Sequence, residues 1–183
     1  TWMNPGLYAR GMNVGAPPDP LSLQGQDWGL PPVNPVALLD LVGASQWRVT
    51  DNQVTNFIKG SGNQVSYGLF MKGAGEGGRI ERNLVVCTPA GMSQPGARVG
   101  ISFGGGTTDP GSCRVDQCQS GEHFRGLAAH NVVAHCNDVG LDVNRSTDIA
   151  LVHNTLINTA GIGVRHAVSW ATAEANLLEG RLM

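Results

Sequence analysis

The chain has 183 residues, 14% of them charged, and a net charge of −2 at pH 7. This length suits one domain with an appendage, and the lack of a basic or acidic block argues against a nucleic-acid partner. No apolar run is long enough for a membrane-spanning helix. The chain begins at Thr1 and ends at "LLEGRLM", so we expect a fragment on which the presence of a signal peptide cannot be judged.

The first forty residues differ in composition from the rest. Seven of the ten prolines lie at or before Pro35, and "GAPPDPLSLQGQDWGLPP" (15–32) follows neither a helical nor a strand period. We therefore place a boundary between Pro35 and Val42. The predicted units are a Pro-rich segment, 1–40, and a repeat region, 41–183.

The string at 15–35 is specific as well as Pro-rich. It matches G-[AV]-PPD-x-[LF]-S-x-x-GQ-x-WG-x-P at every fixed position, including Asp19, Ser22, Gln26 and Trp28. About residues 1–38 thus closely resemble the 4-α-glucanotransferase (amylomaltase) family, in which this string lies beside the glucan-binding cleft of a TIM-type barrel. Retaining transglycosylation needs two carboxyl groups, which the resemblance implies on later barrel strands that have no counterpart here. We expect an orphan piece of a glucan enzyme without its activity.

Five asparagines mark a repeat in the rest of the chain. An apolar residue lies three positions before and two positions after each, and the spacings between them are 31, 48, 23 and 22 residues. Apolar positions five apart cannot share one face of a flat strand, because side chains alternate with period two. We therefore predict a bend at each asparagine, which tolerates the left-handed conformation. The five are Asn52, Asn83, Asn131, Asn154 and Asn176.

A second repeated string, G-[LI]-x-[apolar], occurs as "GLFM", "GISF", "GLDV" and "GIGV". It predicts inward pairs Leu69/Met71, Ile101/Phe103, Leu141/Val143 and Ile162/Val164, with Phe70, Ser102, Asp142 and Gly163 facing outward. We interpret the 48-residue spacing as two periods, with "GGGTTDPGSCRVDQCQSGEH" as an irregular coil. A period of 22–23 residues made of short strands and turns is typical of a β-solenoid.

On "WRVTDNQVTNF", "RIERNLVV", "DVGLDVNRS" and "VHNTLINTAGIGVR", about residues 42–183 resemble the right-handed parallel β-helix family. The resemblance implies an all-β fold of about five coils, each giving strands to three parallel sheets, after a non-repeating Pro-rich N-terminal segment. Identical side chains one coil apart can stack, so we expect the five asparagines to form a hydrogen-bonded ladder with a structural role.

The cysteines and histidines offer little metal chemistry. Four cysteines form no paired CxxC motif, which argues against zinc. Buried free thiols are the favoured interpretation, and a Cys113–Cys118 disulfide stays open for a secreted chain. His130 and His153 fall one repeat apart, near His135, and stacking explains them as well as a metal does. We predict no metal and no cofactor.

The candidate binding residues are polar positions on the predicted outward face. Lys72, Asp142 and Arg165 follow or interrupt the second string, and Arg98 precedes "VGISF". Lysine and arginine can neutralise a uronate carboxylate while a base removes the adjacent proton. An ordinary solvated face explains the same residues, and Trp47 and Trp170 fit either sugar stacking or coil-edge packing.

Two functional hypotheses remain, since fold alone does not give function. The favoured one is a carbohydrate-binding or scaffold β-helix without catalysis. The alternative is a polysaccharide lyase-like enzyme for acidic sugars, which requires Lys72, Arg98, Asp142 and Arg165 to converge in one groove. A polysaccharide partner and an extracellular or periplasmic location are expected in both cases.

Overall fold

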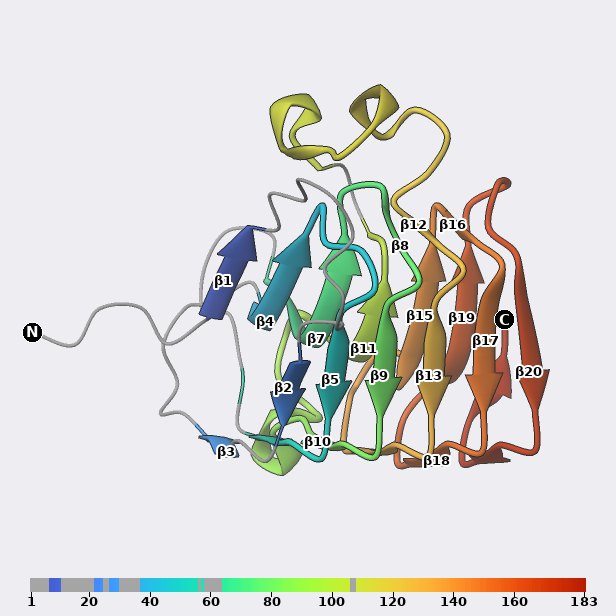
Figure 1. Cartoon of the computed structure of the whole chain (residues 1–183). Coiled ribbons are helices and arrows are strands. Elements are labelled where there is room, and N and C mark those ends of the chain that lie inside the picture. The colour runs from blue at the N-terminus through green and yellow to red at the C-terminus, as the bar shows by residue number, and fades with distance from the viewer. Residues whose placement is uncertain are drawn as a thin grey trace, which may run out of the picture.

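The computed structural model describes residues 7–10, 22–24, 27–29, 37–55, 57, 64–105 and 108–183. Within these ranges the chain is built from short strands in four parallel sheets, with three 3-10 helices of one turn each, η1 (Pro89–Gly91), η2 (Pro110–Ser112) and η3 (Asp116–Cys118). Figure 1 shows strands of successive turns lying side by side from one end of the molecule to the other. The arrangement is all-β and consistent with a β-solenoid, and its sheets are open rather than closed.

Each sheet collects one strand from successive turns of the chain. In the described ranges the first sheet contains β1 (Leu7–Arg10), β4 (Ala37–Val42), β7 (Val65–Lys72), β11 (Ala97–Phe103), β15 (Leu141–Asn144), β19 (Gly161–Arg165) and β22 (Arg181–Leu182). The second contains β2 (Ser22–Gln24), β5 (Arg48–Thr50), β9 (Arg79–Glu81), β13 (Leu127–Ala129), β17 (Ile149–Val152) and β20 (Ala171–Glu174).

The third sheet contains β3 (Asp27–Gly29), β6 (Gln53–Thr55), β10 (Leu84–Val86), β14 (Val132–Ala134), β18 (Thr155–Ile157) and β21 (Leu177–Leu178). A fourth, of β8 (Gly75–Glu76), β12 (His123–Phe124) and β16 (Ser146–Thr147), joins the first to the second. Three sheets were predicted. Two-residue strands such as "GE" and "HF" carry no alternation that the sequence could reveal.

The core lies between the sheets and follows the predicted register. Leu69 pairs with Ile101, then Leu141, then Ile162, and the Met71 position continues through Phe103 and Val143 to Val164. All are buried except Val164, which is half-buried against the core. The prediction of these inward pairs is therefore confirmed. The glycine before each pair lets neighbouring backbones approach closely, since a Cβ on Gly68 would lie 2.6 Å from the Gly100 carbonyl oxygen.

The bend between the second and third sheets differs from the prediction in one respect. The left-handed residue is the one before each asparagine, with φ between 50° and 59° at Asp51, Arg82, His130, His153 and Ala175. The prediction that the asparagine itself takes this conformation was wrong. Its side chain turns inward instead, and each of the first four donates through Nδ2 to Oδ1 of the next asparagine at 2.9–3.0 Å.

The 48-residue spacing is one turn of the chain, not two. Ile80 of β9 pairs directly with Ala128 of β13, and Asn83 bonds directly to Asn131. The additional length lies in two insertions, 87–96 around η1 and 104–122 around η2 and η3. Insertions of this kind do not disturb the stacking of the strands, because the inserted residues lie between strands and not within them. In Figure 1 the second insertion stands beyond the strand ends.

The N-terminal segment contributes strands to the same sheets. β1 pairs in parallel with β4, β2 with β5, and β3 with β6. The expectation of a non-repeating segment is therefore corrected at these three strands. β4 (Ala37–Val42) also crosses the expected boundary at residue 40. The division into units 1–40 and 41–183 stays a prediction.

All four cysteines are oxidised. One disulfide joins Cys87 to Cys136, both fully buried at neighbouring turns, and the other joins Cys113 to Cys118 in the second insertion. The prediction of free thiols was wrong, because the 48-residue turn brings Cys87 beside Cys136. Counting that spacing as two periods had placed the two cysteines two turns apart. In the described ranges no helix has the length and apolar character needed to cross a membrane.

Candidate functional site

The first sheet brings two of the four candidate residues together. Asp142 of β15 lies next to Ser102 of β11 and Gly163 of β19, and Arg165 ends β19. The Arg165 Nε lies 3.2 Å from Asp142 Oδ1, and the Ser102 hydroxyl lies 3.3 Å from Asp142 Oδ2. Asp142 and Arg165 therefore form a cross-strand ion pair on the face opposite the core.

This face is covered rather than open. Asp142 is 2% exposed and Phe70 3% exposed, so the expectation of an outward, solvated stripe is wrong at these positions. Burial raises the pKa of Asp142 to about 6, against the lowering effect of Arg165. Burial and the neighbouring Asp142 charge also raise the pKa of Tyr67 to about 12, so its phenol stays protonated at neutral pH.

Lys72 and Arg165, two of the cations on this sheet, are already paired. Arg165 Nη2 donates to Asp138 Oδ1 at 2.5 Å, so its guanidinium bridges two carboxylates. Lys72 Nζ lies 3.2 Å from Asp40 Oδ2 and 4.3 Å from the centre of the Phe70 ring. Burial raises the pKa of Asp40, and Lys72 opposes that shift. Neither cation has an unopposed charge to offer a uronate.

Arg98 is separated from this group. Its guanidinium donates to the backbone carbonyls of Gly91 (2.7 Å) and Pro95 (3.0 Å), and burial lowers its pKa. It is 1% exposed. Arg98 therefore holds the first insertion against the sheet, and the four candidates do not converge in one groove.

Replacing Asp142 by asparagine should remove part of the pH dependence of stability. The folded pKa of about 6 lies above the ordinary 3.8, so folding favours the protonated carboxyl group. That contribution is complete below about pH 4 and is lost as the pH rises through about 6. Two pKa units correspond to about 3 kcal/mol. Urea denaturation from pH 3 to pH 8 should show wild type losing stability relative to Asp142→Asn across this window.

The exposed Asp148 provides the control for that measurement. Asp148→Asn removes one exposed carboxyl group and is measured under the same conditions. Parallel profiles for wild type and Asp142→Asn would contradict the burial of this carboxyl group.

The histidine positions form pairs rather than a metal cluster. His130 and His153 stack with ring centres 5.1 Å apart, while His135 Nδ1 lies 3.0 Å from Asn158 Nδ2. In the same column Arg82 bonds Asp51 through both carboxylate oxygens. Across the described part of the chain no group of three or more His, Cys, Asp or Glu residues is placed to hold a metal.

The two candidate tryptophans differ in exposure. Trp47 packs against the core cluster, whereas Trp170 is 55% exposed. Coil-edge packing therefore describes Trp47, and the role of Trp170 stays a prediction.

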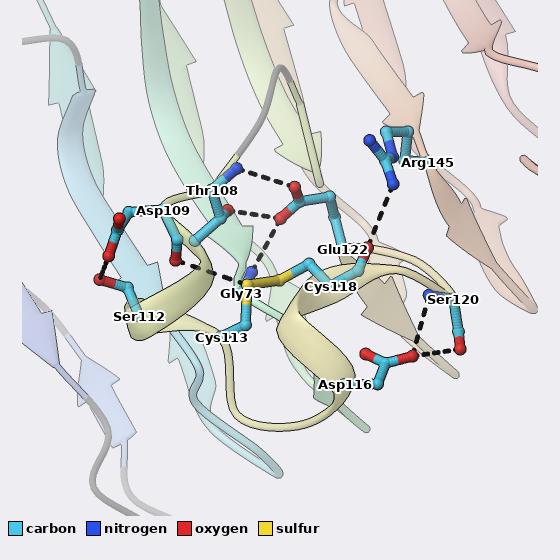
Figure 2. The surroundings of a disulfide bond; sticks show 10 residues. All are labelled: Gly73, Thr108, Asp109, Ser112, Cys113, Asp116, Cys118, Ser120, Glu122 and Arg145. Carbon is cyan, nitrogen blue, oxygen red and sulfur yellow. Dashed lines mark hydrogen bonds between the residues drawn. A yellow bond between two sulfur atoms is a disulfide. The ribbon is translucent and has the colours of Figure 1, made fainter.

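A recess that the sequence analysis did not single out lies under the second insertion. It has a volume of about 520 Å³ and polar lining from Thr108, Asp109, Gln117, Gln119, Glu122 and Arg145. Glu122 is 1% exposed and accepts from the backbone N–H groups of Gly73 (3.1 Å) and Thr108 (2.9 Å). Figure 2 shows the Glu122 carboxylate between Thr108 and Arg145. Glu122 thus ties the insertion to the first and fourth sheets.

The disulfide and an arginine complete the recess, which we call the loop pocket. Cys118 lines it and is bonded to Cys113, and the Cys118 carbonyl accepts from Arg145 Nη2 at 3.1 Å (Figure 2). Arg145 Nε is buried and has no hydrogen-bond partner. Two cysteines five apart in a polar, strand-poor insertion were the available sequence signal, but it did not indicate a cavity.

Comparison with known proteins finds similarity at the N-terminal end. The family model described as 4-alpha-glucanotransferase matches residues 1–48. Over 37 residues the chain is 54% identical to the 4-alpha-glucanotransferase of Haemophilus influenzae, a stretch that is 20% of this chain and 5% of that enzyme. No solved structure matches the chain. The predicted glucanotransferase-like fragment is confirmed, and the chain spans 5% of the length of that relative.

The residues of that fragment fall partly outside the described ranges. Asp19 and Gln26 lie outside them, whereas Ser22 begins β2 and Trp28 is the central residue of β3. The match therefore fixes a sequence relationship for this segment and assigns no active site to it.

Proposed function

We propose that this chain is a carbohydrate-binding scaffold without catalysis of its own, built as a right-handed parallel β-helix. The observation that carries the proposal is the internal pairing of the candidate cations, Lys72 with Asp40 and Arg165 with Asp138 and Asp142. A lyase needs a cation free to neutralise the substrate carboxylate. Binding and scaffolding need none.

Three further features support the details. Parallel pairing with long connections favours right-handed crossovers, by the general rule for such units. The asparagine bonds at each bend satisfy buried amides, which supports a structural ladder of Asn52, Asn83, Asn131, Asn154 and Asn176. Two disulfides favour an oxidising compartment, extracellular or periplasmic.

The carbohydrate part of the proposal rests on the N-terminal match. We propose that residues 1–40 are a glucanotransferase-derived segment joined to a β-helix at 41–183, and that Asp19, Ser22, Gln26 and Trp28 are its remnant. A retaining mechanism needs a nucleophile and an acid/base carboxyl group about 5–5.5 Å apart, and this segment supplies Asp19 without a partner from a barrel. We therefore expect no glucanotransferase activity.

A second candidate function is a lyase-like reaction at Asp142. Its buried carboxyl group, with a pKa of about 6 beside Arg165, has the perturbed character common at catalytic sites. The 2% exposure of Asp142 argues against access by a polymer.

Purified chain should bind polysaccharide and leave it intact. Affinity gel electrophoresis in soluble starch, and separately in polygalacturonate, should show retardation in at least one gel. Incubation with both polymers should generate neither reducing ends nor the ultraviolet absorbance of unsaturated uronates. Absence of retardation in every polymer contradicts the binding proposal, and unsaturated products that disappear in Asp142→Asn establish the lyase alternative.

A further inference from the structure

The loop pocket has the size and preorganisation of a ligand site. Its volume of about 520 Å³ lies within the roughly 300–1,000 Å³ typical of small-molecule pockets. Its walls are held by the Cys113–Cys118 disulfide, by the hydrogen bonds to Glu122, and by the hydrogen bond from Arg145 to the Cys118 carbonyl. A wall fixed before binding lowers the entropy lost on binding.

The free hydrogen-bonding groups of the pocket come from two glutamines, which lie beside an arginine. Gln117 and Gln119 are exposed, and each amide offers two donors and an acceptor. Arg145 also lines the pocket, where its Nη2 donates to the Cys118 carbonyl, whereas its Nε is buried. By contrast, both Glu122 oxygens already accept bonds from Gly73 and Thr108. The pocket therefore presents planar donor and acceptor pairs, which match vicinal hydroxyl groups.

Charge decides between neutral and acidic ligands. Asp109 and Glu122 oppose Arg145, so the lining does not carry the excess positive charge that an anion requires. Arg145 makes no ion pair with a carboxylate among the described residues, but the Glu122 carboxylate lines the same recess. A neutral, hydroxyl-rich ligand satisfies the donors without placing a second anion beside Glu122.

We propose that the loop pocket binds a neutral oligosaccharide, with Gln117 and Gln119 as the hydrogen-bonding residues, Arg145 as part of the lining, and the Cys113–Cys118 disulfide as the element that keeps them in place. This inference rests on the proposed carbohydrate-binding function and assigns it a site. The N-terminal glucanotransferase-like match makes an α-1,4-glucan the first probe.

Isothermal titration calorimetry with maltotriose tests the assignment. Gln117→Ala/Gln119→Ala should weaken maltotriose binding at least about tenfold, because two amide contacts to the sugar are lost. Both side chains are exposed, so thermal unfolding should be unchanged. Gln53→Ala, at an exposed glutamine of β6, is the matched control and should bind like wild type.

A second pair of variants tests the disulfide. Cys113→Ser/Cys118→Ser should also weaken maltotriose binding, while the fold, followed by circular dichroism, persists through the intact Cys87–Cys136 bond. Undiminished binding by both pocket variants overturns the assignment. So does tighter binding of trigalacturonate than of maltotriose, since it reverses the charge argument.

The outcomes separate this inference from the proposed function. Starch retardation without maltotriose binding, or with binding indifferent to the pocket variants, overturns the pocket and leaves the carbohydrate role standing. Failure of every polysaccharide and of maltotriose overturns both.

Discussion

Asn131→Ala should lower the free energy of unfolding by about 4 kcal/mol, because several buried polar groups lose partners that are each worth about 1–3 kcal/mol. Asn131 Oδ1 accepts from the backbone N–H of Asn83 (2.9 Å) and from Asn83 Nδ2 (3.0 Å). Its own Nδ2 donates to Ile80 O (2.8 Å) and to Asn154 Oδ1 (2.9 Å). Asn131 is 1% exposed, so water cannot replace these bonds.

Two comparison variants separate hydrogen bonding from volume. Asn131→Asp keeps the size but turns the donor into an oxygen that faces Ile80 O, and it should destabilise as much as alanine at pH 7. Asn176→Ala breaks analogous bonds to Asn154 at a half-buried position, where solvent can substitute. It should cost about 1 kcal/mol. Urea denaturation measures all three, and equal losses at Asn131 and Asn176 would contradict a buried network.

Removing the Cys87–Cys136 disulfide should destabilise the chain about twice as much as removing Cys113–Cys118. The first bond closes a loop with a sequence separation of 49 and the second a loop with a separation of 5. In the chain-entropy treatment these loops correspond to about 4 and about 2 kcal/mol. Cys87 and Cys136 also lie in the core, so their loss removes packing as well.

The measurement compares Cys87→Ala/Cys136→Ala with Cys113→Ser/Cys118→Ser by urea denaturation under non-reducing conditions. Wild type in excess dithiol reductant should fall below both variants, because it lacks both bonds. A larger loss from the short loop than from the long one would contradict the assignment of the Cys87–Cys136 bond to the core.

The repeat pattern was sufficient to predict which residues of successive turns lie next to each other in a sheet. Each of Val49, Ile80, Ala128, Leu151 and Ala173 pairs with the next, as their common offset from the asparagines indicates. Period-two alternation and a shared turn specify such a register strongly, since a slip of one residue would turn the whole set outward. The same pattern could not count turns, because insertion length and turn length are indistinguishable in a spacing of 48.

The candidate site was predicted less well. Asp142 lies within "GLDV" and Arg165 follows "GIGV", and in the structure the two side chains form an ion pair between neighbouring strands. Their burial and their pairing with Asp138 depend on contacts between turns and on the residues that cover the sheet. Such contacts produce no periodic pattern in the sequence. The environment of Arg98 could not be predicted for a similar reason. Its partners are backbone carbonyl groups of an insertion, which any residue type supplies.

The loop pocket shows a different limit. Gly73 and Glu122 are 49 residues apart, and the backbone N–H of Gly73 donates to the side-chain carboxylate of Glu122. Because any residue at position 73 except proline could supply this donor, no side-chain pattern in the sequence indicates the contact. A cavity under an irregular segment can be predicted only if the contacts that fold the segment back on itself are known. Here the Cys113–Cys118 disulfide makes that contact. The two cysteines suggested a loop, but its position over Arg145 required the stacked strands to be in place.

The most direct test of carbohydrate binding in the loop pocket is a two-dimensional ¹H–¹⁵N NMR titration of the oxidised chain with maltotriose. The structure predicts saturable shifts confined to the side-chain amides of Gln117 and Gln119 and to backbone amides near Cys118. Shifts that are absent, or that gather on the covered first-sheet face around Asp142, would contradict it.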